Sequence, residues 1–205
     1  MNIHVVDGFY NITNLNAVIN SSYNYEWSFN RRDVDLDYYW TKEIYGEMYT
    51  SGTLQKKYDE FKVKEVECLW DEFSKKFNVS IKSLESCYVN GLTFGTEAFP
   101  HTDFSTEGNT SVIIYLCENW NSFWSGETVF FDHNFVYNDP ANEIFYQHDI
   151  IKSVLPKFNR MVLFDGNITH AVRPISKSFK GLRKTLMFKL KNIPIQQIME
   201  NYKCS

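Results

Sequence analysis

In the second part of the chain, short apolar runs alternate with turn-forming residues. After residue 80 there are eight such runs, each with the length of a single β-strand. They span residues 83–90, 93–97, 110–117, 127–131, 150–155, 160–164, 168–173 and 183–190. Short strands at this regular spacing are typical of an all-β sandwich or barrel, so we expect a jelly roll.

The first residues of the chain show a different pattern. Residues 3–6 alternate weakly, which predicts a short edge strand. Asp7 is a suitable N-cap for a helix that runs to about Asn20, because apolar residues then recur at helical spacing.

Residues 21–54 keep no period, and their many aromatic side chains are expected to pack on the core. Within them we expect irregular structure, a strand near 25–29 and a short helix near 38–48. From Leu54 to Phe77 apolar residues recur every three or four positions, which predicts a long amphipathic helix ending at Asn78.

The segment from Pro194 to Tyr202 again has helical spacing and is expected to cap the sheet. No linker or internal repeat divides the chain, so we expect one domain over residues 1–205. The expected parts are a helical and irregular support (1–79), a jelly-roll core (80–192) and a C-terminal helix (193–205). The predicted fold is therefore mostly β with flanking helices.

Composition limits the possible partners. The net charge of −4 argues against bulk binding to a nucleic-acid backbone. No run of apolar residues is long enough for a membrane span, and the first seven residues lack the features of a signal peptide. The four cysteines have no CxxC spacing, so a zinc ribbon is not expected. We expect a cytoplasmic protein with free thiols.

Three side chains form a candidate metal site. His101 and Asp103 are two residues apart, so on an extended strand both point to the same side. His170 follows the apolar run 160–164 and a turn, which places it at the start of another strand. Two histidines and one carboxylate are the ligand set of non-haem Fe(II) oxygenases. The alternative is a surface turn together with a core histidine.

A candidate anion site follows on the last predicted strand. Arg183 shares one face with Thr185 and Met187 by the period of two. A guanidinium that points into a barrel needs an anion, because an unpaired buried charge is costly. A carboxylate bound by the planar fork is the natural partner. Lys184 stands beside Arg183 but should point outward by the same alternation, which favours Arg183.

Several motifs occur in a characteristic order over about 80–192. They are Cys87-Tyr88-Val89-Asn90-Gly91, His101-Thr102-Asp103, Val112-Ile113-Ile114-Tyr115-Leu116 with Trp120, Ser125-Gly126-Glu127-Thr128, Pro156 to Phe164, His170-Ala171-Val172-Arg173-Pro174 and Gly181-Leu182-Arg183-Lys184-Thr185-Leu186. In this order the chain resembles the Fe(II)/2-oxoglutarate-dependent dioxygenases, and among them the prolyl-4-hydroxylase-like group. One departure is that the usual Gly-Gly of the middle motif reads Ser125-Gly126 here.

The resemblance implies a double-stranded β-helix and a set of roles. His101, Asp103 and His170 would bind Fe(II). Arg183 would hold the distal carboxylate of 2-oxoglutarate, with Tyr115 and Tyr88 donating hydrogen bonds. The implied reaction uses O₂, yields succinate and CO₂, and hydroxylates an unactivated C–H bond; ascorbate is expected to stimulate it.

The substrate stays open at this point. The resemblance suggests a peptidyl proline or another protein side chain, whereas similar small members act on free amino acids, nucleobases or small metabolites. A metal-binding module without catalysis and a zinc hydrolase with the same ligands are further alternatives. Residues 21–54 and 132–149 are expected to form the entrance. The sequence does not indicate the oligomeric state.

Overall fold

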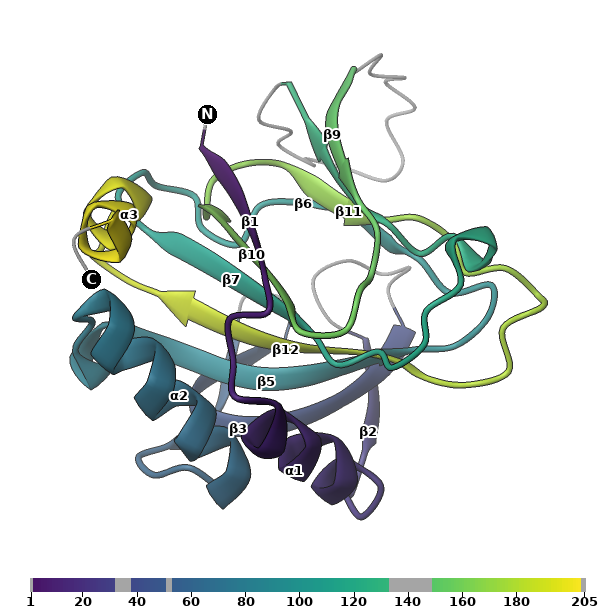
Figure 1. Cartoon of the computed structure of the whole chain (residues 1–205), viewed down its shortest axis with the longest axis horizontal. Helices are drawn as coiled ribbons and strands as arrows, with labels where there is room; N and C mark the ends of the chain where they lie inside the picture. The colour runs from purple at the N-terminus through teal and green to yellow at the C-terminus, as the bar shows by residue number, and fades with distance from the viewer. Residues whose placement is uncertain (1, 32–37, 51–52, 133–148, 204–205) are drawn as a thin grey trace.

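The computed structural model describes residues 2–31, 38–50, 53–132 and 149–203 of the chain (Figure 1). Its helices are α1 (Ile12–Ser22), α2 (Lys64–Phe77) and α3 (Ile195–Lys203). Its strands are β1 (Ile3–Asp7), β2 (Ser28–Arg31), β3 (Tyr38–Thr50), β4 (Thr53–Tyr58), β5 (Leu84–Leu92), β6 (Ala98–His101), β7 (Thr110–Tyr115), β8 (Thr128–Phe131), β9 (Ile150–Val154), β10 (Arg160–Asp165), β11 (His170–Val172) and β12 (Arg183–Leu190).

The described strands form two antiparallel sheets. The larger sheet has the order β1-β10-β7-β12-β5-β3-β2, with β4 paired to β3, and the smaller has the order β6-β11-β8-β9. Consecutive strands repeatedly change sheet, as β7 and β8 do, so the core winds as a double-stranded β-helix. The fold class predicted from the short apolar runs is confirmed.

A first hydrophobic cluster lies between the sheets. Tyr88, Ile113 and Met187 of the larger sheet belong to it together with Phe130 and Val154 of the smaller sheet. Because successive strand residues point to opposite faces, each strand of the larger sheet contributes to this interior with every second side chain. The interior is where both candidate sites lie.

The helices cover the opposite face of the larger sheet (Figure 1). The apolar side of α2 is fully buried there, and the ring of Trp70 meets the ring of Phe188 of β12 edge-on at 5.4 Å between centroids. α1 adds Leu15 and Val18 to the same cluster. Helical packing on the outer face leaves the inner face available for the site.

The predicted helix near 38–48 is wrong, because these residues form the strand β3. β3 pairs with β2 along one edge and with β5 along the other, so its backbone groups are satisfied by neighbouring strands. Tyr39 and Thr41, two residues apart, are both buried, while Trp40 between them is exposed. This alternation of buried and exposed side chains is that of a strand. It is hard to recognise in the sequence because aromatic residues occupy both buried and exposed positions.

The predicted helix from Leu54 begins ten residues later, at Lys64. Its first part is instead the strand β4, which pairs with β3 as a hairpin. The predicted end is confirmed, since Asn78 caps the helix in the left-handed conformation with φ of 51°.

The first helix also begins later than predicted. Its N-cap is Asn11, whose side-chain oxygen accepts from the backbone N–H of Thr13 at 2.8 Å. Asp7 instead ends β1, where it pairs with Arg160 and Lys157. Asp7 is therefore not a helix cap, and its ion pair with Arg160 joins the end of β1 to the start of β10.

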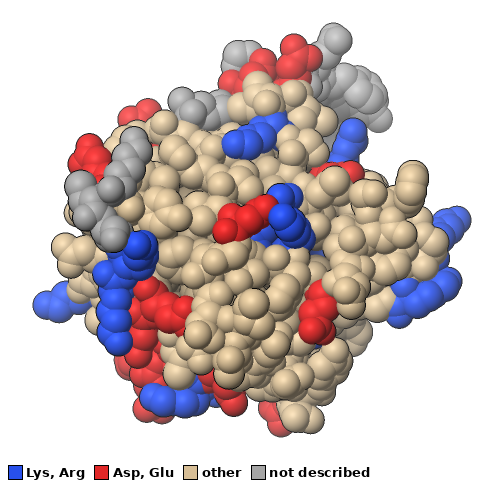
Figure 2. All heavy atoms as spheres, viewed as in Figure 1, with Lys and Arg blue, Asp and Glu red and all other residues tan. Residues whose placement is uncertain are grey.

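The eight predicted apolar runs match strands with one exception. The run 93–97 is a turn, and the strand β6 begins after it at Ala98. Of the predicted entrance, residues 32–37, 51–52 and 133–148 lie outside the described residues. Within the described parts of the chain, no helix is long and apolar enough to cross a membrane. Figure 2 shows acidic and basic side chains interspersed over the face drawn.

Candidate metal centre and co-substrate site

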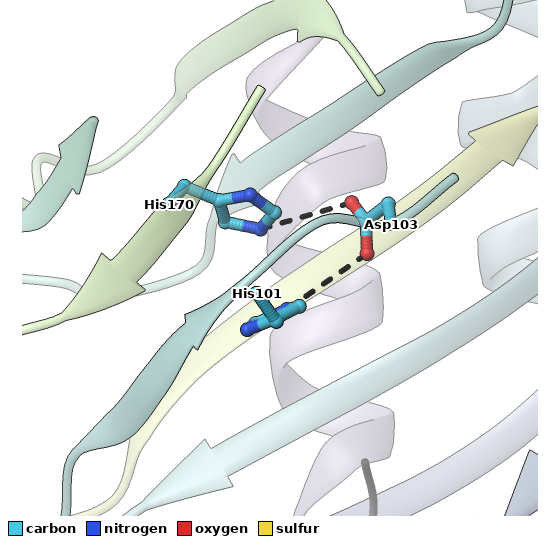
Figure 3. A group of neighbouring side chains, drawn as sticks. All are labelled: His101, Asp103 and His170. Carbon is cyan, nitrogen blue, oxygen red and sulfur yellow. Dashed lines mark ion pairs between the residues drawn. The ribbon is translucent and has the colours of Figure 1, made fainter. Parts of the chain in front are cut away.

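His101 and His170 lie opposite each other on two paired antiparallel strands. His101 ends β6, His170 begins β11, and the two residues are direct partners in the antiparallel pair. Their ring centroids are 4.5 Å apart. A strand pairing therefore joins two histidines that are far apart in the sequence. Asp103 follows β6 by two residues, and its side chain turns to the same point (Figure 3).

The three side chains converge on a small volume. One potential ligand atom of each lies within 4.8 Å of the others. Nε2 of His101 is 4.0 Å from Oδ1 of Asp103, and Nε2 of His170 is 3.8 Å from Oδ2 (Figure 3). Within the described parts of the chain, Oδ2 of Asp103 is buried and has no hydrogen-bond partner. A buried oxygen in that condition is well suited to ligate a cation.

Backbone carbonyl groups orient both imidazole rings. Nδ1 of His101 lies 2.8 Å from the carbonyl oxygen of Phe99, and Nδ1 of His170 lies 3.0 Å from that of Ile168. A carbonyl only accepts, so each Nδ1 carries the proton and donates it. Each Nε2 then presents its lone pair to the shared point, as a metal ligand requires.

The electrostatics agree with this assignment. Burial lowers the pKa of His170 to about 4, assisted by the neighbouring His101, so its ring is neutral at pH 7. Burial alone would raise the pKa of Asp103, but the ammonium of Lys189, together with the neighbouring His170 and His101, outweighs burial and holds the pKa below its usual range. Two neutral imidazoles and one carboxylate are the donor set that suits Fe(II). The residues present therefore fit the metal.

Arg183 lies at the start of β12 and is almost completely buried. Its Nε donates to the carbonyl oxygen of Gly126 at 2.9 Å, and Nη2 donates to Oγ1 of Thr128 at 3.3 Å. No carboxylate of the described residues forms an ion pair with it. A buried guanidinium without an anion is costly, which fits a site for the carboxylate of a bound molecule.

The two tyrosines of the resemblance lie on β7 and β5, the two strands that flank β12. The hydroxyl of Tyr115 is 2.7 Å from Oγ1 of Thr128, and it donates to the carbonyl oxygen of Val154 at 3.2 Å. Burial raises the pKa of Tyr115, so it stays a neutral hydrogen-bonding group. Tyr88 of β5 is 6% exposed and lines the interior cavity together with Arg183.

One cavity contains both candidate sites. The empty space in and in front of this cavity, open solvent at its mouth included, is about 520 Å³. His101, Asp103, His170 and Arg183 all line it, and Tyr88 and Thr128 contribute further polar groups. The metal ligands and the buried cation therefore face a common space, as a metal-chelating molecule with a second carboxylate would require.

Lys184 lies on the opposite face of β12 from this cavity. Its Nζ donates to Oγ of Ser22 in α1 at 2.7 Å and lies 4.4 Å from the centre of the Tyr23 ring. Lys184 thus does not share the cavity with the metal ligands.

The middle motif supplies the contact to Arg183. Ser125 stands at φ 60° and ψ −139°, a conformation that side chains with Cβ rarely adopt, and Gly126 follows at φ 75°. Trp120 packs against Gly126 and also against Trp124 and Phe179, with 5.5 and 4.8 Å between ring centroids. These aromatic rings pack against the loop whose Gly126 carbonyl oxygen accepts the hydrogen bond from Arg183.

Sequence reasoning missed three polar residues of the site: Lys189, Thr128 and Asn90. Lys189 forms an ion pair with Asp103, Thr128 contacts both Arg183 and Tyr115, and Asn90 lines the cavity with a buried Oδ1. The period of two on β12 would have put Lys189 on the face of Arg183. The same period on β5 would have put Asn90 on the face of Tyr88, whereas Thr128 had no comparable signal.

A model of the 2OG-Fe(II) oxygenase superfamily matches residues 86–188, half of the chain. The match includes His101, Asp103, His170 and Arg183. No curated protein matches the chain.

Solved structures with a similar fold come from several sources. A prolyl-4-hydroxylase from Pseudomonas putida is 13% identical with a TM-score of 0.59, covering 92% of each chain. A prolyl hydroxylase from Trichoplax adhaerens, in complex with a peptide of the hypoxia-inducible-factor oxygen degradation domain, is 16% identical with a TM-score of 0.59, covering 99% of this chain and 86% of that one. A viral collagen prolyl hydroxylase from Paramecium bursaria Chlorella virus-1, in complex with 2-oxoglutarate, is 12% identical with a TM-score of 0.56, covering 93% and 96%.

Proposed function

The chain belongs to the 2OG-Fe(II) oxygenase superfamily, and we propose that it hydroxylates an unactivated C–H bond of a proline residue in a peptide. It is a dioxygenase whose cofactors are Fe(II), 2-oxoglutarate and O₂. The proposal concerns which residues carry this chemistry and which substrate they accept.

One observation carries the assignment of residues. The three convergent ligands and the buried Arg183 line a single cavity, and neither the ligand oxygen Oδ2 of Asp103 nor the guanidinium has a complete set of partners among the described residues. A bound metal would give Oδ2 of Asp103 its missing partner. A dicarboxylate that binds the metal at one end and reaches Arg183 with the other would give the guanidinium its missing anion.

The protein groups have separate tasks. His101 and His170 would offer Nε2 to the iron, and Asp103 would offer an oxygen, leaving three positions for 2-oxoglutarate and O₂. When bound, the iron couples oxidative decarboxylation of 2-oxoglutarate to hydroxylation of the substrate, with succinate and CO₂ as the other products. The buried walls around His170 exclude water from this step.

The far end of the cavity would bind the distal carboxylate of 2-oxoglutarate. Arg183 supplies the charge and a planar set of N–H donors. Tyr115 and Thr128, whose hydroxyl groups already touch each other, can each turn a proton toward a carboxylate oxygen. The carbonyl oxygen of Gly126 accepts from Nε of Arg183 and holds the guanidinium in place, whereas the single hydroxyl proton of Tyr115 would leave the carbonyl oxygen of Val154 when it turns to the carboxylate.

Two features support a peptidyl proline as the substrate. Three proteins with a similar fold are named as prolyl hydroxylases, one of them bound to a peptide. The cavity also contains the aromatic side chains of Tyr39 and Tyr88, which offer flat apolar surface for a pyrrolidine ring. A free amino acid or a small metabolite is the second candidate, because Asn90 and Thr185 also line the cavity.

The test is a turnover assay on the purified chain reconstituted with Fe(II) and 2-oxoglutarate without oxygen. After O₂ is admitted, succinate is measured with a panel of proline-containing peptides, with the same peptides carrying alanine for proline, and with free amino acids. We expect iron-dependent succinate formation that rises with a proline peptide, and one added oxygen atom on the proline by mass spectrometry.

Two variants separate the assignment of residues from the choice of substrate. Asp103→Ala should abolish iron binding and all succinate formation, and full activity in it would disprove the ligand assignment. Wild-type succinate formation that responds to a free amino acid, but to no proline peptide, would instead favour the second candidate.

A further inference from the structure

The inner face of β12 carries two cations. Arg183 stands at its start and Lys189 near its end, six residues on, so their Cα atoms are roughly 20 Å apart along the strand. Arg183 has a task in the proposed function, whereas Lys189 has none so far. Lys189 lies at the end of the strand that is next to the metal ligands.

Lys189 contacts one particular oxygen of the ligand carboxylate. Its Nζ is 2.8 Å from Oδ1 of Asp103 and 5.8 Å from the centre of the Tyr88 ring. The carboxylate is 2% exposed and the lysine side chain 18% exposed. The pair is thus largely withdrawn from water, in contrast to the exposed ion pairs on the surface of the protein.

The contact makes the two carboxylate oxygens different. Oδ1 has the ammonium as its partner, while Oδ2 lies 3.8 Å from Nε2 of His170 and has no hydrogen-bond partner among the described residues. A carboxylate held in this way offers one oxygen to a metal. A carboxylate that bound through both oxygens would occupy a coordination position needed by 2-oxoglutarate or O₂.

The contact also balances charge. A carboxylate at this depth is costly unless a cation accompanies it. Of the lysines and arginines in the described parts of the chain, Lys189 is the one that forms an ion pair with Asp103. The two histidines nearby hold their protons on Nδ1, toward carbonyl groups, and supply no such charge.

We propose that Lys189 is a positioning residue of the metal centre: it serves as an internal counter-ion that holds Oδ1 of Asp103 and directs Oδ2 to the metal. This inference rests on the proposed ligand assignment. It has a definite thermodynamic consequence. Without Lys189 the metal-free site contains an unpaired buried carboxylate, which a bound divalent cation then compensates. In addition, a metal cation bound by Asp103 is then no longer repelled by the nearby ammonium group of Lys189.

The test compares Lys189→Met, of similar length without charge, with Lys189→Arg, which retains the charge. Lys191→Met is the matched control, because Lys191 pairs with Glu85 and its side chain is 56% exposed. Co(II), which is stable in air, is titrated into the metal-free proteins by calorimetry, and melting temperatures are recorded with and without Co(II).

We expect Lys189→Met to melt at a lower temperature than the wild type when metal-free, and to bind Co(II) about tenfold more tightly or better. Lys189→Arg and Lys191→Met should behave as the wild type. Lys189→Gln replaces Lys189→Met if the latter does not fold.

A spectroscopic readout distinguishes positioning from a merely structural role. Anaerobic Fe(II) with 2-oxoglutarate should give a charge-transfer band in the wild type. A cation near the iron stabilises the electron-rich Fe(II) form, so its removal should move the band to longer wavelength in Lys189→Met. The Lys191→Met band should not move.

Two outcomes would overturn the inference in different ways. Unchanged or weaker Co(II) binding and an unmoved band in Lys189→Met, with normal metal binding in the wild type, would overturn the counter-ion role alone. Wild-type protein that binds neither Co(II) nor Fe(II) would overturn the proposed ligand assignment and this inference together.

Discussion

The guanidinium of Arg183 lies over the ring of Tyr115, with 5.2 Å between its central carbon and the ring centre. Both side chains are almost fully buried, although 67 residues separate them in the sequence. They come from adjacent strands, since Tyr115 of β7 is the direct partner of Thr185 of β12. The ring face stabilises the cation in the absence of an anion, and the Arg183 side chain also lines the cavity.

Replacing Arg183 by Met should weaken 2-oxoglutarate binding by about 10- to 100-fold, the effect of losing a charge-assisted contact to a carboxylate. Co(II) affinity should not change, because the metal ligands lie at the other end of the cavity. Calorimetric titration of the Co(II)-loaded protein with 2-oxoglutarate measures this.

Lys184→Met is the control for Arg183→Met. Lys184 contacts Ser22 on the opposite face of the strand, so 2-oxoglutarate affinity should be that of the wild type. A large loss of affinity in Lys184→Met, with none in Arg183→Met, would show that the neighbouring lysine holds the co-substrate instead.

Replacing Tyr115 by Phe removes a hydroxyl group that contacts Oγ1 of Thr128 and the carbonyl oxygen of Val154. We expect the free energy of unfolding to fall by about 1 kcal/mol, because one buried hydrogen-bonding network loses a member. Affinity for 2-oxoglutarate should fall less than in Arg183→Met, since the charge remains. Chemical denaturation and the same calorimetric titration give both quantities; an affinity loss equal to that of Arg183→Met would contradict the ranking.

Phe188 tests the packing of the helices on the outer face of the larger sheet. It is fully buried, and its ring contacts the rings of Trp70 and Phe73 of α2. Phe188→Ala should lower the free energy of unfolding by about 3–5 kcal/mol through lost burial and the cavity left behind. Because this face is turned away from the site, Co(II) affinity of the folded protein should stay unchanged. Phe188→Leu should cost clearly less in denaturation experiments.

Asp7 gives a prediction for pH dependence. Its hydrogen bond to Arg160, with a further contribution from Lys157, lowers the pKa of Asp7 to about 2. A group whose pKa is lower in the folded state stabilises the protein above its unfolded pKa, and this stability is lost as pH falls through the folded value. Asp7→Asn should therefore be less stable than the wild type at pH 7, by less than about 1 kcal/mol because the pair is partly exposed.

The Asp7→Asn difference should shrink as pH falls from about 4 and vanish only below about pH 2. Urea denaturation of both proteins across this range provides the measurement. A difference that persisted undiminished at pH 2 would mean that Asp7 acts through its shape and not through its charge.

Local pattern identified the strands of the core but misjudged part of the N-terminal region. Tyr38–Thr50 is a strand because β2 and β5 lie on either side and pair with its backbone groups. The sequence of this segment alone does not show that these neighbouring strands are present. Likewise, the helical pattern from Leu54 was extended too far, because β4 needs only the adjacent β3 to form its hairpin. Whether a segment forms a strand depends on its pairing partner, near or distant in sequence, which the segment's own pattern does not reveal.

The candidate site divides in the same way. The residue types of His101, Asp103, His170 and Arg183 and their order along the chain pointed to the chemistry, because few ligand sets combine these side chains. The pairing of His101 with His170 and the 2.8 Å contact of Lys189 with Asp103 required the folded sheets.

By itself, the sequence determined the fold class, the family resemblance and the candidate ligands, since period, turn residues and ligand types are all local properties. Only the tertiary structure decided which groups face the cavity together and which oxygen of Asp103 is left for a metal. That depends on strand register and on a buried ion pair, where distant residues must meet in space before their charges can act on one another.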